Sequence, residues 1–369
     1  MNNEPLYVLI QPETRNSYWA DNIRTGIREA AREWRDAICA IDPARAETLP
    51  DLNERRVLVV GNDAAWLEPA LSRLMNRGAQ PIIVNACMLP VRQFRCSGVV
   101  FELEEMLDQC LARLNASGRR RTVLLGVNPG SVTDHVKADA FGRPEDIIWS
   151  PGRLDDCVSD FIDRLDETGF DSVICANDTV AVCLVQQLLA LGCKLPERLH
   201  IIGMGNSYVG AQLKIPLTSV MFDYRQMGEA AVRLYHSLCA SPLPCHMTVS
   251  LPCRLIVRES APVGSKPAAS PIPPVIPQPQ RSYFDSDMVQ NIIRAEAMLQ
   301  AGDTIDREIL FGIARGETCD AIAERLFFSS RAVRYRIANL VKQYGFENRP
   351  ALEDAIRRAI GSNEERNPS

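Results

Sequence analysis

The sequence has little of what metal sites and disulfide frameworks need. It contains only four His among 369 residues, and its 12 Cys include no Cys-x-x-Cys pair. We therefore expect no metal, no cofactor and no disulfide framework. Most cysteines, such as Cys175 and Cys183, lie in apolar runs and are predicted to be small core residues. This cysteine usage favours a reducing compartment.

Long hydrophobic runs are also missing. No apolar stretch reaches the ~18 residues that a membrane span needs. The start, "MNNEPLYVLI", has neither the basic region, nor the long apolar core, nor the cleavage site of a secretory signal. The prediction is a cytoplasmic protein with no membrane partner.

Motifs of common enzymes are absent as well. The sequence has no Gly-x-Ser-x-Gly nucleophile elbow and no phosphate-binding P-loop. Gly203, Gly205 and Gly210 do not have the spacing of a dinucleotide-binding fingerprint. No nucleophile stands with a matching base, so an enzyme is not expected.

Basic charge is not in excess. The chain carries 41 Lys+Arg against 46 Asp+Glu, a formal net charge of −5. This balance argues against a wholly basic nucleic-acid binder, although a local basic patch remains compatible with it.

What is present in excess is proline, in one place. The stretch 261–280, "APVGSKPAASPIPPVIPQPQ", holds seven prolines in twenty residues, and such a run builds neither a helix nor a central strand. It predicts an extended spacer; a ligand for a proline-binding module is the alternative. The chain is thus expected to divide into residues 1–260, a linker 261–282 and residues 283–369.

Residues 1–260 alternate short apolar runs with helical segments. The runs are "PLYVLI", "RRVLVVG", "QPIIVNA", "SGVVFE", "RTVLLGV", "DSVICA" and "LHIIGMG". Continuous apolar strands with crossover helices predict parallel sheets covered on both faces. The length is too great for one comfortable sheet, which predicts two α/β lobes. Residues 18–34 have helical spacing, with Ile23, Ile27, Ala30, Ala31 and Trp34 on one face.

One long segment carries a family resemblance. Residues 169–228 contain "SVICAND", a helix ending at "LG", "LPERLHIIG" and "IPLTSV", and "PCRLIVRES" follows later. This order resembles the effector-binding domain of LacI/GalR-type regulators, which share the fold of periplasmic sugar-binding proteins. The resemblance implies two lobes that close on a small, carbohydrate-like ligand.

The resemblance also implies ligand-binding residues. These are Asn16, Tyr18 and Trp19 after the first strand, Glu105, Lys137 in "KADAF", Asn177 with Asp178, and Tyr224 in "FDYR". Other interpretations stay open: the Asn177–Asp178 pair fits a helix cap, Lys137 a surface lysine and Trp19 a core residue. The chain departs from the family pattern at Gly205, where an Asp is usual, and at Lys137, which lacks the planar fork of an Arg.

Residues 303–360 predict four helices with clear caps. Asp303 or Thr304 caps the first, Gly316 ends it, and Thr318 caps the second. Ser329 or Ser330 caps the third, and a fourth begins near 350. The expected apolar faces consist of Ile305, Ile309, Leu310 and Ile313; Ile322, Ala323 and Leu326; and Val333, Ile337, Leu340, Val341 and Tyr344.

The third of these helices has a basic face opposite its apolar one. At ~100° per residue, Arg331, Arg334, Tyr335, Ala338 and Lys342 fall away from the apolar stripe. A basic face alone is typical of many solvated helices, but a short capped helix and a tight turn come just before this one. A helix whose first turns carry Arg fits the major groove.

This segment resembles the LuxR-type helix-turn-helix. The matching pieces are "REIL", "GETCDAIAERL", "SSRAVRYRI" and "YGFENRPAL". The resemblance implies duplex DNA as partner, with Arg334 and Arg336 at the basic contact positions. The full set expected at the interface is Ser330, Arg331, Arg334, Tyr335, Arg336, Asn339 and Lys342.

Together these features predict a ligand-responsive transcription factor with a two-lobed α/β sensor and a small all-α DNA-binding domain. Both parent families imply a homodimer on a near-palindromic operator, and an effector would change the dimer geometry across the spacer. LacI/GalR regulators carry their DNA head at the N-terminus, and no such head is expected before residue 5. Residues 283–302 predict a helix that packs on its own domain or forms a dimer contact. The competing hypothesis is a small-molecule sensor or adaptor that acts through a protein partner.

Overall fold

The computed structural model describes residues 5–14, 17–41, 52–85, 87–241, 244–262 and 286–360. The chain forms two compact units. The first unit comprises Met1–Asp108, Pro129–Pro144 and Phe222–Arg254, and the second comprises Gln109–Asn128, Glu145–Met221 and Leu255–Ser369. Most of the proline-rich stretch, like Asn16, lies outside the described residues.

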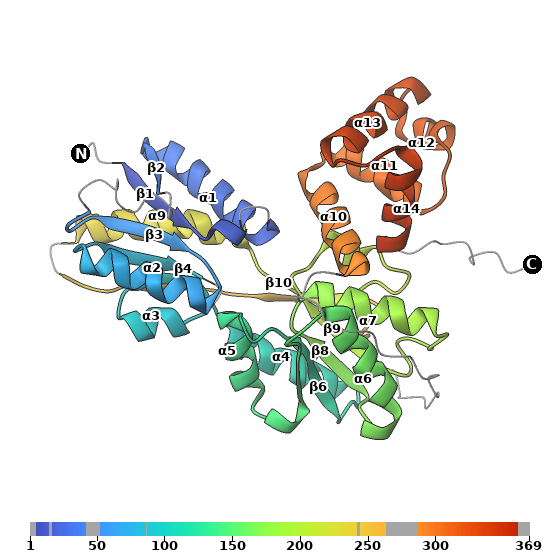
Figure 1. The fold of residues 1–369 in the computed structure, drawn as a ribbon, viewed down its shortest axis with the longest axis horizontal. Coiled ribbons are helices and arrows are strands. Elements are labelled where there is room, and N and C mark those ends of the chain that lie inside the picture. Colours follow the sequence, from blue (N-terminus) through green and yellow to red (C-terminus); the bar gives the residue numbers. More distant parts are fainter. Residues whose placement is uncertain are drawn as a thin grey trace, which may run out of the picture. The chain divides into compact units, whose positions relative to one another are not determined.

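The first unit is built on a six-stranded parallel sheet with the order β11-β5-β4-β3-β1-β2. The strands are β1 (Leu6–Ile10), β2 (Ile38–Ile41), β3 (Arg56–Val60), β4 (Gln80–Val84), β5 (Ser97–Phe101) and β11 (Thr248–Leu251). Figure 1 shows α1 (Tyr18–Trp34) and α9 (Tyr224–Ala240) over one face, with α2 (Ala64–Asn76) and α3 (Leu89–Phe94) over the other. Covered on both faces, the strands are apolar throughout, as the sequence predicted.

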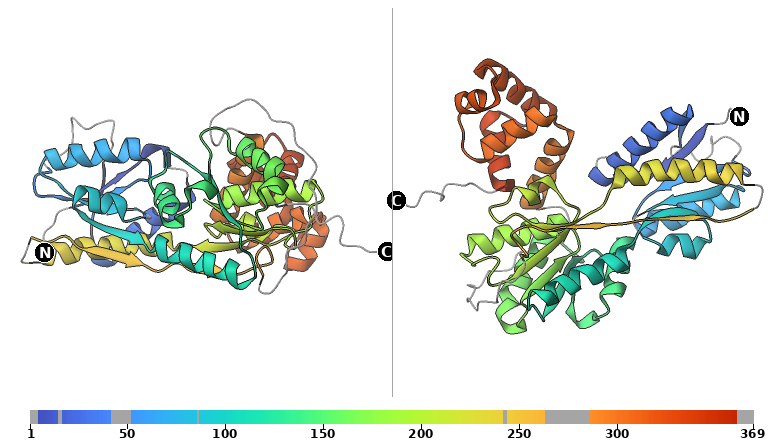
Figure 2. Two further views of the ribbon diagram at one scale, coloured as in Figure 1. Left: turned by 90° about the horizontal axis from the view of Figure 1, so that it is seen from below. Right: turned by 180° about the vertical axis from the view of Figure 1, so that it is seen from behind.

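Helices α1 and α9 lie side by side, and two glycines let them approach closely (Figure 2). A Cβ on Gly26 would overlap the Arg225 carbonyl oxygen, and a Cβ on Gly228 would overlap the Ile23 carbonyl oxygen. Backbone contact at this distance is open to glycine alone. The prediction that Trp34 lies on the buried apolar face of α1 is wrong. Its side chain is 51% exposed, and its ring stacks on that of His236 of α9, with 4.0 Å between the ring centroids.

The second unit repeats the same winding in a sheet with the order β12-β10-β9-β8-β6-β7. Its strands are β6 (Thr122–Val127), β7 (Ile147–Trp149), β8 (Ser172–Cys175), β9 (His200–Met204), β10 (Thr218–Met221) and β12 (Arg254–Ile256). Three helices follow its strands in turn: α6 (Leu154–Thr168), α7 (Asp178–Ala190) and α8 (Tyr208–Ala211). Cys175 and Cys183 are buried here, as predicted.

Two further helices carry the chain between strands. Helix α4 (Leu103–Ala116) follows β5, and α5 (Val132–Phe141) follows β6. All seven predicted strands are present, whereas β2, β7, β10, β11 and β12 were not predicted. Each of these five has three or four residues and, unlike the four-residue β8, is not buried throughout. Each therefore lacks the continuous apolar run that marks a buried strand in the sequence.

The last described residues form five helices: α10 (Asp287–Ala301), α11 (Thr304–Ala314), α12 (Cys319–Leu326), α13 (Ser330–Gln343) and α14 (Arg349–Ile360). We call them the helical group. The predicted caps are confirmed: Asp303 accepts from Asp306 N, Thr318 from Ala321 N and Ser329 from Ala332 N. No helix in the described part of the chain is long and apolar enough to cross a membrane.

Candidate functional site

The starts of α1 and α9 bring aromatic rings together in the first unit. The Tyr224 ring centroid lies 6.2 Å from that of Tyr18, edge to face, and 6.4 Å from that of Trp19. Phe101 and Phe222 extend the group, at 5.6 and 5.8 Å from Tyr224. We call these five residues the aromatic cluster. It unites three predicted ligand contacts with two rings that the sequence reasoning missed, although "FDYR" placed Phe222 beside Tyr224.

The aromatic cluster occupies a favourable place for a ligand. Helix α1 follows β1, and Phe101 ends β5 of the same parallel sheet. Open α/β sheets bind ligands beyond the carboxyl ends of their strands. Tyr18 is 37% exposed, and Trp19 and Tyr224 are half-buried. Flat, partly exposed faces at this edge are suited to contact with the apolar face of a sugar ring.

Lys137 is a buried cation rather than a surface lysine. It is 8% exposed in α5, and its Nζ lies 2.8 Å from Asp134 Oδ1. The start of α5 is held in turn: Ser131 caps it, and Asn62 Nδ2 donates to Ser131 Oγ at 3.1 Å. Its ligand contact stays a prediction, as does that of Glu105, which is exposed in the first turn of α4.

In the second unit, Asp178 has internal partners. Its Oδ1 accepts from Ser219 Oγ and its Oδ2 from Ser207 N, each at 2.6 Å. The carboxyl group is 5% exposed. Burial raises its pKa, while the bonds from Ser219 and Ser207 and the charge of Arg258 oppose the rise. These bonds give Asp178 a structural role, and its contact with a ligand remains a prediction.

The Asp178 network has two more members. Asn206 N donates to Ser219 Oγ at 2.9 Å, and Arg258 Nη2 donates to Asn206 Oδ1 at 2.7 Å. A Cβ on Gly203 would overlap Asp178 Oδ1, so a glycine is required beside the carboxylate. Asn177 caps α7 through Val180 N at 3.0 Å, which was the alternative left open; its contact with a ligand remains a prediction. No sequence signal pointed to Asn206, Ser219 or Arg258.

Helix α13 presents most of the predicted nucleic-acid residues to solvent. Arg331, Arg334, Tyr335, Asn339 and Lys342 are exposed, and Ser330 is half-buried at the helix start. Arg334 Nη2 lies 3.1 Å from Asp320 Oδ1. Both side chains of this pair are largely exposed, so water screens it and the guanidinium is available to a stronger anion.

Arg336 differs from these residues. Its Nη1 donates to Asp306 Oδ1 at 2.7 Å and to Asp303 Oδ2 at 2.8 Å. The hydrogen bond that Arg336 donates to Asp306 is the main reason that the pKa of Arg336 is raised. The side chain is 29% exposed. Arg336 thus ties α13 to the start of α11, and its contact with DNA remains a prediction.

The turn between α12 and α13 exposes two aromatic rings. Phe327 is 97% exposed and has a φ of 57°, in the left-handed region, and Phe328 is 40% exposed. Neither ring was singled out from the sequence. The left-handed backbone at Phe327 costs stability, and the exposed ring gains no burial in return.

The fold defines a class: a two-lobed α/β architecture with parallel sheets and additional helices, which resembles that of known transcription regulators. Residues 143–261 match the family model of the periplasmic binding protein-like domain. The transcription regulator CcpA of Lactococcus lactis superimposes with a TM-score of 0.57 at 19% identity, over 70% of this chain and 100% of that one. The regulator CelR in complex with cellobiose gives 0.56 at 18% identity, over 70% and 86%.

Two curated relatives match in sequence over a shorter span. The HTH-type transcriptional regulator MalR of Streptomyces coelicolor is 33% identical over 90 residues, 24% of this chain and 26% of its own. The regulator of the NTD biosynthesis operon NtdR of Bacillus subtilis is 28% identical over 90 residues, 24% and 27%. The chain thus spans about a quarter of the length of these relatives.

Proposed function

We propose that the chain is a cytoplasmic, ligand-responsive transcriptional regulator that binds DNA and acts as a homodimer. The sensor takes a small carbohydrate-like effector, and the helical group, in the manner of a LuxR-type helix-turn-helix, takes a near-palindromic duplex. The observation that carries the proposal is the exposed basic face of α13, which follows a capped α12 after a three-residue turn. A two-lobed fold shared with transcription regulators supports it.

The proposed DNA contacts are Arg331, Arg334 and Lys342, with Tyr335 and Asn339 between them. All five side chains are exposed on one helix. Cations at this density neutralise phosphates and release counterions, so binding weakens as salt rises. The tyrosine and the asparagine supply groups that reach base edges.

The DNA interface is tested with the full chain and fluorescent 30-base-pair duplexes of random sequence, at ~50 and ~200 mM salt. We expect binding at low salt that weakens steeply with salt. Arg331→Ala with Arg334→Ala should reduce affinity at least tenfold. Arg28→Ala, an exposed arginine of α1, is the control. A chain that ignores every duplex at low salt would refute the proposal.

The proposed effector site in the first unit is the aromatic cluster, with Lys137 as a polar contact. In the second unit, Asn177 is proposed as a further polar contact. Cellobiose, lactose and ribose, the sugars named with three of the similar structures, are the first probes. A sugar that binds the native chain raises its melting temperature. Tyr18→Ala with Tyr224→Ala should abolish that rise, whereas Arg233→Ala on the exposed face of α9 should keep it.

A second candidate function rests on Phe327 and Phe328. Aromatic rings exposed at the tip of a turn are typical anchors for a protein partner, which favours the adaptor hypothesis. Phe327→Gly suits the left-handed backbone and removes the anchor. If DNA binding is absent while this substitution abolishes self-association or capture of a defined partner, the adaptor replaces the regulator.

A further inference from the structure

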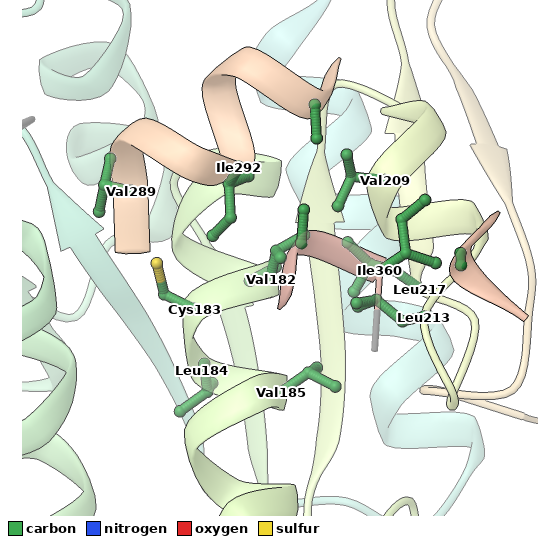
Figure 3. Close-up of a cluster of buried hydrophobic side chains, with 14 of the residues drawn as sticks. Val182, Cys183, Leu184, Val185, Val209, Leu213, Leu217, Val289, Ile292 and Ile360 are labelled. Carbon is green, nitrogen blue, oxygen red and sulfur yellow. The ribbon is translucent and has the colours of Figure 1, made fainter. Parts of the chain in front are cut away.

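Within the second unit, the helical group packs directly against α7 and α8. Val182, Val185 and their neighbours on α7, with Val209, Leu213 and Leu217, form an apolar surface (Figure 3). Val289 and Ile292 of α10 and Ile360 of α14 lie against it, and all of these side chains belong to one buried cluster. All eight of these side chains have no more than 4% of their surface exposed. The predicted α10 therefore packs both on its own helices and on the sensor.

Polar contacts fix the register of this packing. The carboxylate of Glu296 accepts from Tyr208 N at 3.0 Å and from Val209 N at 2.8 Å. Gln186 Nε2 of α7 donates to Arg358 O and Ala359 O at the end of α14, each at 2.7 Å. Glu296 thus satisfies the backbone amides at the start of α8, and Gln186 satisfies the backbone carbonyls at the end of α14. Such helix-end groups have no partner within their own helix. Apolar contact alone would not impose such complementarity.

The α8 contact also leads back to the Asp178 network. Ser207 N donates to Asp178, and the next two amides, of Tyr208 and Val209, donate to Glu296. The preceding Gly205 and Asn206 have φ values of 141° and 50°. This short segment leaves β9 at the carboxyl edge of the sheet, where ligands of open α/β folds bind. The segment is therefore tied at one end to the Asp178 network and at the other to Glu296.

We propose that Gly205–Val209, the β9–α8 segment, couples the carboxyl edge of the second sheet mechanically to the helical group. A shift of Asn206 or Ser207 moves the amides that Glu296 holds, and a shift of α10 moves the segment in return. The identity of the two signals, an effector at one end and DNA at the other, rests on the proposed function. The coupling itself does not.

The docked arrangement leaves the basic face of α13 open. Docking uses α10 and α14, and Figure 1 shows α12 and α13 on the side of the helical group away from α7. The residues of that face are exposed. The coupling therefore acts on the orientation of the recognition helix and does not mask it. This route is separate from the change of dimer geometry that the sequence led us to expect.

Hydrogen–deuterium exchange of the full chain tests the coupling without any ligand. Glu296→Ala should speed exchange at Tyr208 and Val209 by about 10- to 100-fold, since a charge-assisted bond to each amide is lost. The diagnostic effect lies further on: Asn206 and Ser207 should also exchange about 3- to 30-fold faster. Arg294→Ala, on the exposed side of α10, is the control and should change none of these rates.

The reverse experiment uses Arg258, which holds Asn206. Arg258→Ala should speed exchange in α10 around Glu296 by a comparable factor, because coupling between two sites is reciprocal. Glu259→Ala, an exposed neighbour, is the control. Glu296→Gln, which keeps one acceptor oxygen, replaces Glu296→Ala if the latter fails to fold and should give a smaller change of the same sign.

The outcomes separate the coupling from the proposed function. Changes confined to the substituted end, or no change at Tyr208 and Val209, would overturn the coupling even if the wild-type chain binds DNA. Reciprocal changes in a chain that binds no duplex at low salt would retain the coupling and refute the regulator.

Discussion

The two sheets of this chain have the same strand order but carry different side chains at their carboxyl edges. In each, the first strand lies between the second and the third, and a late strand closes the far edge. The first unit gathers aromatic rings at the start of α1 and α9. The second fills the corresponding edge with the Asp178 network and carries the helical group on α7 and α8. Topology thus fixes where groups converge, and side-chain chemistry decides whether they bind a ligand or hold the fold.

The largest expected loss of stability comes from substituting Asp178 in the second unit. Asp178→Ala leaves Ser207 N and Ser219 Oγ without their acceptor in a buried place and should lower the free energy of unfolding by about 3–5 kcal/mol. Asp178→Asn keeps one acceptor oxygen and should cost less. Urea denaturation measures both. If Asp178→Ala is as stable as the wild type and loses only sugar affinity, Asp178 contacts the ligand and does not stabilise the fold.

The next largest effect is the dependence of the stability of the second unit on pH. Burial lowers the pKa of His200, at the start of β9, from 6.5 to about 4. Below about pH 6.5 the unfolded chain takes up a proton that folded His200 accepts only near pH 4, so stability falls as pH falls through this window. At about 1.4 kcal/mol per pKa unit, the loss at pH 4 should be about 3 kcal/mol.

His200→Asn isolates that contribution, because the carboxyl groups are common to both chains. Urea denaturation at pH 7 and pH 4.5 should show a smaller acid-induced loss in the variant than in the wild type. Equal losses would mean that the acid sensitivity of the second unit comes from other groups.

In the first unit, we expect stability to be lost through steric overlap between α1 and α9, because no polar network is involved in the substitution. Gly228→Ala places a Cβ against the Ile23 carbonyl oxygen and should cost about 2 kcal/mol by forcing α1 and α9 apart. Arg233→Ala on the exposed face of α9 should change stability by less than about 0.5 kcal/mol. Thermal unfolding compares the two. An unaffected Gly228→Ala would show that the helices separate without cost.

The smallest expected effect concerns two arginines of α13. Arg336→Ala removes the link to Asp303 and Asp306 and should lower the free energy of unfolding by about 1 kcal/mol. Arg334→Ala should leave stability unchanged and weaken duplex binding instead. Paired denaturation and fluorescence-polarisation measurements separate these roles. If both variants lose DNA affinity equally and neither changes in stability, Arg336 contacts DNA as Arg334 does.

Much of this architecture was predictable because its determinants are local. Seven of the strands, the first helix and three caps of the helical group follow from apolar periodicity and from polar residues at helix starts. The aromatic cluster was partly predictable, since its members stand at strand and helix ends where ligand sites form. Short edge strands such as β7 escaped detection because three residues carry no measurable period.

The sequence by itself determined the parallel α/β winding, the capped helices and the opposed apolar and basic faces of α13. These features depend on residues a few positions apart. Only the tertiary structure decided that Asp178 is held by Ser219, 41 residues away, that Arg336 reaches back 33 residues to Asp303, and that Gln186 meets Ala359 across 173. The physical reason is that a polar side chain near a strand end or on a helix face fits several partners equally well in sequence, and only the packed fold brings one of them within hydrogen-bonding distance.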